Sequence, residues 1–137
     1  MKTSFVADGD RDFLSLAERQ LTFLAYQVTT FRTSTELLNA LKQKPTLIII
    51  GELLDGSHAI DLIQAARKAL PSTLIFHVAR TSAWADAVSS VRAGATEFIE
   101  KNSASLVRLR TSLDLLERKE LGKTKALLSN IKKVFSK

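Results

Sequence analysis

Apolar and polar positions along most of the chain follow two different periods. Short apolar runs bounded by turn-forming residues predict strands, and they lie at 3–8, 26–30, 46–50, 74–79 and 96–100. The run LIII at 47–50 is apolar at every position, as expected of a strand buried on both faces. Between the runs, apolar residues recur three and four positions apart, which is helical spacing. Strands that alternate with helices at this interval predict parallel βαβ units in a doubly wound sheet.

Local signals support the helices and their ends. Expected helices begin near residues 11, 34, 59, 84 and 105. The string Thr33-Ser34-Thr35-Glu36 is a capping signal for the second helix, because a threonine hydroxyl can accept from the first free backbone N–H groups. Gly94 follows the fourth helix at the position where glycine usually ends one. Asp55-Gly56 is expected to be a turn.

Charge and composition argue against several classes of function. The chain has 137 residues and a formal net charge of +6, yet residues 119–137 alone hold six lysines against one glutamate. A protein that grips nucleic acid more often spreads basic residues over a folded face, so specific nucleic-acid binding is not expected. There is no cysteine, which excludes a disulfide scaffold and cysteine-based metal or redox chemistry. The apolar runs are far shorter than the ~20 residues of a membrane span, and the sequence has no signal-peptide pattern. We therefore expect a cytoplasmic location.

Four strings, in order and at the right spacing, resemble the receiver domain of two-component response regulators. They are DGDRDFL (8–14), LAYQVTTF (24–31), PTLIIIGELLDG (45–56) and RAGATEFIEKN (92–102). The resemblance covers residues 3–118 and implies a CheY-like, flavodoxin-like (βα)5 three-layer α/β sandwich with parallel strand order 2-1-3-4-5. Residues 1–118 are therefore expected to form one domain, and residues 119–137 a helical tail.

The residues that carry phosphorylation in this family are mostly replaced here. By the resemblance, Gly51 stands where the phosphoacceptor aspartate is expected, and Gly9 where the more direct Mg²⁺ ligand is expected. Val78 replaces a threonine or serine that bonds the phosphoryl group, and only Asp8 and Lys101 are retained. Phosphoryl transfer to a carboxylate needs a nucleophile and a metal anchored by carboxylates. The resemblance thus implies a degenerate pseudo-receiver that is not an enzyme, uses no cofactor and holds no metal.

The remaining pocket residues carry narrower expectations. Asp8 and Lys101 are expected to face each other, either as a structural salt bridge or as a residual switch or anion site. Glu52 is expected to point to the opposite side of the sheet if the strand persists, because side chains alternate along a strand. Asp55, in the following turn, is expected to be too distant to act as a substitute phosphoacceptor.

Aromatic and histidine side chains supply the other candidates. Phe98 matches the family's switch aromatic without its hydroxyl. Either an apolar pair of Phe98 with Val78 locks one conformation, or Phe98 simply packs on the surface or at the edge of the core. His77 is expected in the core and His58 in a loop, since neither has a second ligand at metal-binding spacing. Trp84 opens the fourth helix, either as an exposed interaction anchor or as a cover for the core. The expected partner or dimer face is made of Trp84, Arg92, Phe98, Glu100 and Arg108.

The tail is a basic amphipathic segment. Apolar residues recur at three- and four-residue spacing among lysines, with Leu128, Ile131, Lys132, Lys133 and Phe135 as the candidate contacts. The phase of this stripe slips after Leu116, and Gly122 lies just beyond the slip, so a break or kink is expected there. Three interpretations stay open: packing on the body or on a second copy, binding a partner or an anionic membrane surface, or linking to a further domain.

The expected function is that of a phosphorylation-independent signalling module that binds a protein partner, with a second copy of the chain as a further candidate partner. Two alternatives remain. One is a targeting adaptor whose basic helix binds a membrane or scaffold. The other is a receiver that is still phosphorylated on an unusual carboxylate.

Overall fold

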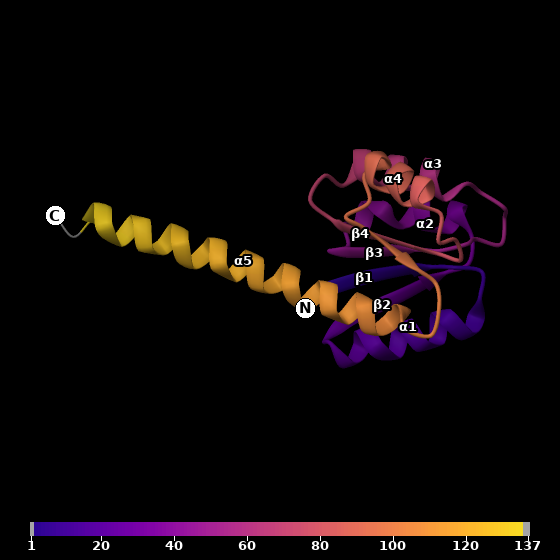
Figure 1. Ribbon diagram of the computed structural model, residues 1–137, viewed down its shortest axis with the longest axis horizontal. Coiled ribbons are helices and arrows are strands. Elements are labelled where there is room, and N and C mark those ends of the chain that lie inside the picture. The colour runs from indigo at the N-terminus through magenta and orange to yellow at the C-terminus, as the bar shows by residue number, and fades with distance from the viewer. Residues whose placement is uncertain (1, 136–137) are drawn as a thin grey trace. The chain divides into compact units, whose positions relative to one another are not determined.

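Five parallel strands form a single sheet at the centre of the molecule. The computed structural model describes residues 2–135, apart from the side chains of residues 120, 121, 123–125, 127 and 132–135. The strands are β1 (Lys2–Ala7), β2 (Tyr26–Phe31), β3 (Leu47–Ile50), β4 (Leu74–Ala79) and β5 (Glu97–Glu100). Their order across the sheet is β2-β1-β3-β4-β5, with every neighbouring pair parallel. The predicted strand order and strand positions are therefore confirmed (Figure 1).

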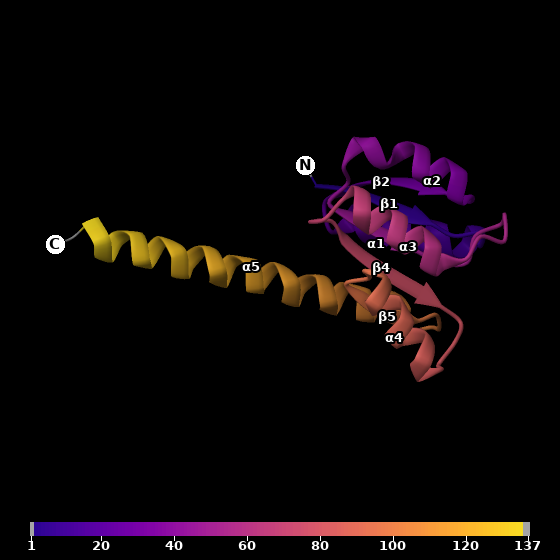
Figure 2. The same cartoon turned by 90° about the horizontal axis from the view of Figure 1, so that it is seen from above.

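Helices alternate with the strands along the chain. They are α1 (Arg11–Phe23), α2 (Ser34–Ala40) with a 3-10 turn over Leu41–Gln43, α3 (Ala59–Ala69), α4 (Trp84–Ala93) and α5 (Ser105–Phe135). α1 lies on one face of the sheet, whereas α2, α3 and α4 lie on the other (Figures 1 and 2). The predicted capping residue of α2 is confirmed, because the Thr33 hydroxyl accepts from Glu36 N at 3.4 Å.

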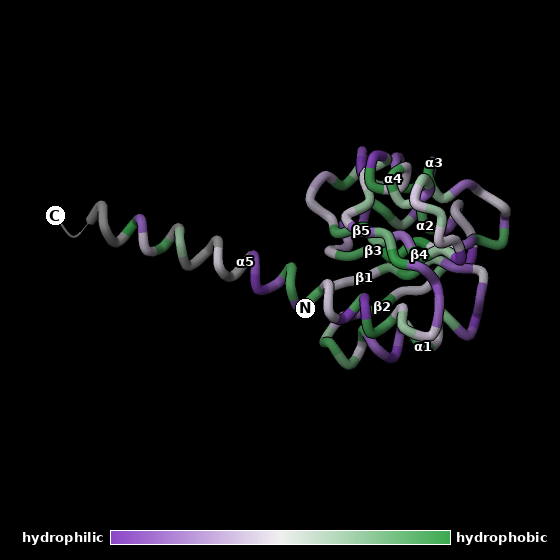
Figure 3. The backbone as a smooth tube through the Cα atoms, in the orientation of Figure 1, coloured by the Kyte–Doolittle hydropathy of each residue, from purple (hydrophilic) through white to green (hydrophobic). Residues whose placement is uncertain are grey.

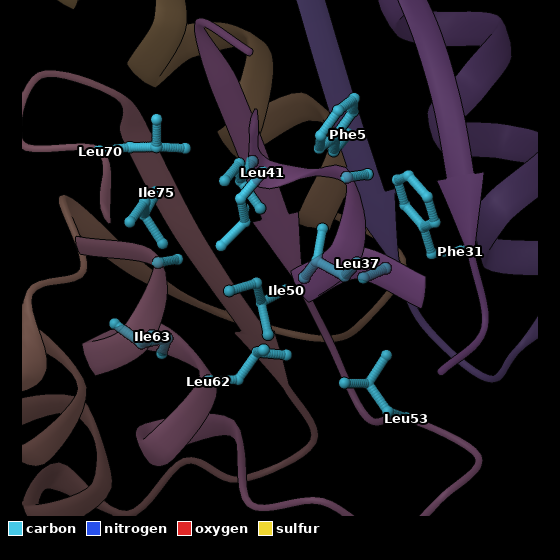
Figure 4. Close-up of a cluster of buried hydrophobic side chains, with 14 of the residues drawn as sticks. Phe5, Phe31, Leu37, Leu41, Ile50, Leu53, Leu62, Ile63, Leu70 and Ile75 are labelled. Atoms are coloured by element: carbon cyan, nitrogen blue, oxygen red, sulfur yellow. The ribbon is translucent and has the colours of Figure 1, made fainter. Parts of the chain in front are cut away.

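The core is centred on β3, whose four residues are fully buried. A buried cluster fills the space between the sheet and α2 and α3, where Ile50 on β3 lies beside Leu62 on α3 (Figure 4). The rings of Phe5 and Phe31 meet edge to face in this cluster, with centroids 5.0 Å apart. The hydropathy-coloured trace shows the inner strands as hydrophobic, while polar positions alternate on the helices (Figure 3). Burial of apolar surface on both faces of β3 explains why its sequence is continuously apolar.

The last helix differs from the sequence-based expectation. α5 runs from Ser105 to Phe135 as one element that continues through Gly122, so the predicted break there is wrong. Glycine in a helix interior costs only about 1 kcal/mol relative to alanine, which a long helix can absorb. The chain divides into two compact units, one ending at Ser105 and one beginning at Leu106. The predicted boundary after residue 118 falls inside α5.

Within α5, Leu109 and Leu113 are buried, while Leu115, Leu128 and Ile131 are exposed. None of the helices within residues 2–135 combines the length and apolar character that crossing a membrane requires.

Arg67 on α3 fixes the end of α4. Its Nε donates to Gly94 O at 2.8 Å, its Nη1 to Leu70 O at 3.1 Å and to Thr73 O at 2.7 Å, and its Nη2 to Thr96 Oγ1 at 3.3 Å. Gly94 has a φ of 122°, and a Cβ there would lie 2.7 Å from both Cβ and Cγ of Arg67. Glycine is required here for its conformation and for the close approach of the arginine.

We predict that Gly94→Ala lowers the free energy of unfolding by about 2 kcal/mol or more, because the new methyl group is strained and displaces Arg67. Urea denaturation followed by circular dichroism measures this loss. The matched control is Gly122→Ala, where nothing lies within 4 Å of the new Cβ and the substitution should not destabilise. Equal stability of Gly94→Ala and the parent chain would contradict the role given to Gly94.

Candidate functional site

The loop after β1 carries the first residue of the site. Asp8 follows the end of β1, its N–H donates to Phe31 O at 3.0 Å, and its side chain is 1% exposed. Its Oδ1 accepts from Asp10 N at 2.8 Å. The next amide, Gly9 N, donates to Glu52 O at 2.7 Å, and Gly9 O accepts from Arg32 Nη2 at 2.9 Å. These bonds hold the loop and leave Asp8 Oδ2 directed into the site.

Lys101 supplies the opposing charge. It follows β5, and its N–H donates to Ala79 O at 2.7 Å. Its Nζ lies 2.9 Å from Asp8 Oδ2, 3.6 Å from Asp10 Oδ2 and 4.6 Å from the centroid of the Phe13 ring. The lysine side chain is only 10% exposed. The predicted ion pair between Asp8 and Lys101 is confirmed, and an aromatic face contributes further to holding the ammonium group.

Gly51 lies beneath this ion pair. β3 ends at Ile50, and Gly51 N donates to Ala7 O at 2.8 Å, which places residue 51 beside the end of β1. A Cβ at position 51 would overlap Asp8 Oδ2 and lie 2.7 Å from Asp8 Cγ. The carboxylate of Asp8 therefore occupies the space in which a side chain on residue 51 would begin. Any larger residue at position 51 requires Asp8 to move.

Gly9 and Val78 complete the predicted pocket without adding a polar group. A Cβ on Gly9 would lie 3.1 Å from Leu54 Cδ2 and 3.2 Å from Glu52 O, so a second acidic residue would also need its neighbours to shift. Val78 is 1% exposed. Of the five predicted pocket residues, the structure thus brings Asp8, Gly51 and Lys101 into direct proximity.

Asp10 is a charged member of the site that the sequence analysis did not single out. It caps α1, where its Oδ1 accepts from Asp12 N at 3.0 Å and from Phe13 N at 3.2 Å. Its Oδ2 lies 3.7 Å from Arg80 Nη2 in addition to the contact with Lys101. The bond from Phe13 N, helped by the charge of Lys101, lowers the pKa of Asp10. An aspartate immediately before a helical pattern is the sequence signal for such a cap.

These residues do not fit a magnesium ion. Mg²⁺ demands near-octahedral oxygen ligation. Asp8 already accepts from Asp10 N and Lys101, and Asp10 is engaged by the start of α1 and by Lys101. Gly9 and Gly51 contribute no carboxylate. In the part of the chain that the structure describes, no group of three or more histidine, aspartate or glutamate residues is placed to hold a metal.

The neighbouring carboxylates are engaged elsewhere. Glu52 lies beyond the end of β3, and its Oε1 accepts from Arg80 N at 3.2 Å. Asp55 accepts from Ser34 N at 3.0 Å, from Ser34 Oγ at 2.6 Å and from Ser57 N at 3.4 Å. The serine hydroxyl bond is the main cause of the lowered pKa of Asp55. Asp55 therefore joins the start of α2 to the loop before α3, consistent with the expectation that it does not substitute at residue 51.

The switch aromatic has a different neighbour from the one expected. The register places Phe98 opposite His77 and Val78 opposite Ile99. Because side chains alternate along a strand, Phe98 and Val78 point to opposite faces of the sheet, and the predicted apolar pair is wrong. The ring of Phe98 instead meets the imidazole of His77 edge to face, with centroids 5.2 Å apart. His77 is buried as expected, whereas His58 is exposed in the loop before α3.

The α4 surface carries an exposed aromatic residue. Trp84 is 81% exposed, which decides between the two interpretations of this residue in favour of an exposed side chain. Val91 is 53% exposed and Arg92 is exposed, while the half-buried Phe98 and Glu100 lie on β5. Arg108, the last residue of the predicted face, is exposed on α5 in the second compact unit.

The predicted tail contacts are only partly covered by the described residues. Leu128 and Ile131 are exposed on α5. Lys132, Lys133 and Phe135 belong to the same helix, but their side chains lie outside the described residues.

Comparison with known proteins shows which fold the chain has. No family model matches the chain, and no curated protein does. Solved structures do match the chain, and the three described below each match it with a probability of 1.00. A CheY-like receiver domain from Methanospirillum hungatei JF-1 has a TM-score of 0.77 at 23% identity, over 89% of this chain and 98% of that one. The chain has the fold of response-regulator receiver domains.

Two further receiver structures show the same similarity. A Burkholderia pseudomallei response regulator, described with a phosphorylated aspartic acid, a calcium ion and citrate, has a TM-score of 0.69 at 22% identity, over 95% of this chain and 87% of that one. The beryllofluoride-activated NtrC4 receiver domain dimer has a TM-score of 0.75 at 22% identity, over 83% of this chain and 94% of that one. At this level of identity, the similarity concerns the receiver fold.

We predict that Lys101→Met lowers the free energy of unfolding by about 3–5 kcal/mol, because it leaves the Asp8 carboxylate buried without its partner. The double variant Asp8→Asn/Lys101→Met should recover part of this loss, and denaturant unfolding of all variants measures the coupling. Arg80→Met is the control, since Arg80 is 66% exposed in its contact with Asp10 and should cost less than about 1 kcal/mol. Similar losses for Lys101→Met and Arg80→Met would contradict the account of the buried pair.

Proposed function

We propose that the chain is a receiver-fold signalling module that acts without phosphorylation and binds a protein partner through the surface of α4 and β5. The observation that carries this proposal is the position of Asp8. Its carboxylate fills the space above Gly51 and pairs with Lys101.

The chemistry of phosphoryl transfer supports a module without a phosphoacceptor. Transfer needs a nucleophile in line with the phosphoryl group and cations that neutralise its developing charge. Gly51 offers no nucleophile, and the ammonium of Lys101 is already paired with Asp8. A ligand shifts a conformational equilibrium only by its differential affinity for the two states. Without a phosphoryl group to bind, the α4 and β5 surface is expected to keep one arrangement.

The α4 surface has the features of a binding face. The only residue of α4 that is buried is Ser90, while Trp84 and Val91 face outward. A shallow hollow on α4 is lined by Ala87, Val88, Val91 and Arg92. Tryptophan and arginine are enriched among residues that dominate binding energy. The partner is a signalling or regulatory protein. A second copy of this chain is the simplest candidate, since the NtrC4 receiver domain is described as a dimer.

Incubation with acetyl phosphate and Mg²⁺, followed by intact-mass measurement, tests phosphorylation independence. We predict that the mass stays unchanged, while a receiver that has a phosphoacceptor aspartate gains one phosphoryl group in the same buffer. A phosphoryl adduct on this chain would overturn the proposal and favour phosphorylation on an unusual carboxylate.

A second candidate function, as a targeting adaptor, rests on α5. Leu128 and Ile131 are exposed on α5, and residues 119–137 of the sequence hold six lysines and one glutamate. Apolar residues among lysines suit an anionic membrane surface, where each lysine contributes about 1 kcal/mol. This composition opposes pairing of the tail with itself, because like charges would be brought together.

Sedimentation with phosphatidylserine-containing vesicles tests the tail. The full chain should bind these vesicles more strongly than neutral phosphatidylcholine vesicles, and Leu128→Ser/Ile131→Ser should abolish the difference. Leu115→Ser is the control, because Leu115 is also an exposed leucine of α5 but lies outside the lysine-rich segment. Binding that is absent, or that survives in the double variant, would exclude this function for the tail.

A further inference from the structure

A buried histidine joins α4 to the sheet. His77 lies on β4 and is 7% exposed. Its Nδ1 lies 3.0 Å from Ser90 Oγ, and its ring meets Phe98 of β5 edge to face. One imidazole thus contacts both elements of the proposed binding surface. Neither the pocket at Gly51 nor any catalytic chemistry requires a titratable group at this position.

The contact with His77 attaches the middle of α4 to the sheet, whereas Arg67 holds its end. Ser90 is the one fully buried residue of α4, and it bonds to His77. The large apolar residues Trp84 and Val91 face outward instead of toward the sheet. Because the apolar residues of α4 that face the body are at most half-buried, losing the Ser90 bond to His77 makes this helix easier to displace than one with large buried apolar side chains.

Burial of His77 favours its neutral form, while nearby carboxylates partly stabilise its charged form. Burial lowers the pKa of His77 below its ordinary value of 6.5, while Asp86 on α4 and Glu52 after β3 act in the opposite direction. On β5, Glu100 shares the face of Phe98 by strand alternation. A second ring proton would place a cation in the space between β4, α4 and Phe98. A buried cation is costly unless it is paired, and Asp86 and Glu52 offset only part of this cost.

We propose that His77 is a proton-sensitive clamp: neutral imidazole holds α4 and Phe98 in the arrangement described here, and protonation releases them. The input to this receiver fold would then be a proton in place of a phosphoryl group. The consequence for partner binding rests on the function proposed above, whereas the structural change does not.

The direction of the pH effect follows from linkage. Well above pH 6.5, His77 is neutral in both the folded and the unfolded chain, and the clamp is complete. As the pH falls below 6.5, the unfolded chain binds a proton first, because the pKa of His77 is lowered in the folded state. The folded arrangement therefore loses stability on acidification, and release of α4 has its midpoint below pH 6.5.

A two-dimensional NMR titration of the full chain, from about pH 8 to about pH 5, tests the clamp. The His77 ring and the amides of α4 and Phe98 should titrate together, with one midpoint below 6.5. In His77→Gln, which cannot take up a proton, the α4 amides should no longer show this transition. His58→Gln is the matched control, since His58 is the only other histidine and is exposed, and it should leave the transition intact.

One additional readout separates the clamp from a merely structural role. Asp86→Asn should lower the midpoint, because Asp86 favours protonated His77. If His77→Gln does not fold, the titrations of the wild-type chain and of Asp86→Asn still test whether His77 acts as the clamp. An α4 transition that persists in His77→Gln, or a His77 ring that titrates without any response in α4, would overturn the proposal. Failure of the chain to bind a partner or a second copy at either pH would count against the proposed function alone.

Discussion

The ion pair between Asp8 and Lys101 ties the carboxyl end of β1 to that of β5, two strands that are not neighbours in the sheet. Both side chains must reach across the tips of β3 and β4, and they can do so only because the tip of β3 is a glycine. A side chain on residue 51 would overlap the Asp8 carboxylate. The missing side chain and the buried ion pair are therefore two aspects of one constraint. When Asp8 is paired with Lys101, there is no space for a side chain on residue 51 at the tip of β3.

This arrangement is costly unless every buried charge is satisfied, because desolvation opposes the attraction within a buried pair. Here each partner has further contacts. Asp10 N donates to Asp8, while Lys101 lies over the Phe13 ring and near Asp10. Such a network binds the loop after β1 to the loop after β5 and leaves neither carboxylate free for a metal. In the proposed function, the surface of α4 and β5 does not depend on phosphoryl chemistry at this edge of the sheet. On the proposed account, His77 is the group through which that surface still responds to its surroundings.

Much of the fold could be predicted from sequence, because the spacing of apolar residues and the residues that begin or end helices and turns are local properties. The apolar run at 47–50, the cap at Thr33 and the stop at Gly94 each determine an element without reference to the rest of the chain. The Asp8–Lys101 pair was also predictable, because parallel strands bring their carboxyl ends to one edge. The neighbour of Phe98 was not, because it depends on the register between β4 and β5, and a shift of one residue exchanges His77 for Val78. The continuity of α5 through Gly122 was missed because a phase slip in an apolar stripe does not by itself break backbone hydrogen bonds.

The most direct test of the central claim is a titration of the full chain with Mg²⁺, followed through the amide resonances of Gly9, Gly51 and Lys101 in two-dimensional NMR spectra. If the internal ion pair occupies the pocket, these resonances should show no saturable shift, with or without beryllofluoride. A saturable shift at Gly9 and Gly51 would show that the pocket still accepts a metal, and would contradict the account of a receiver fold closed by its own aspartate and lysine.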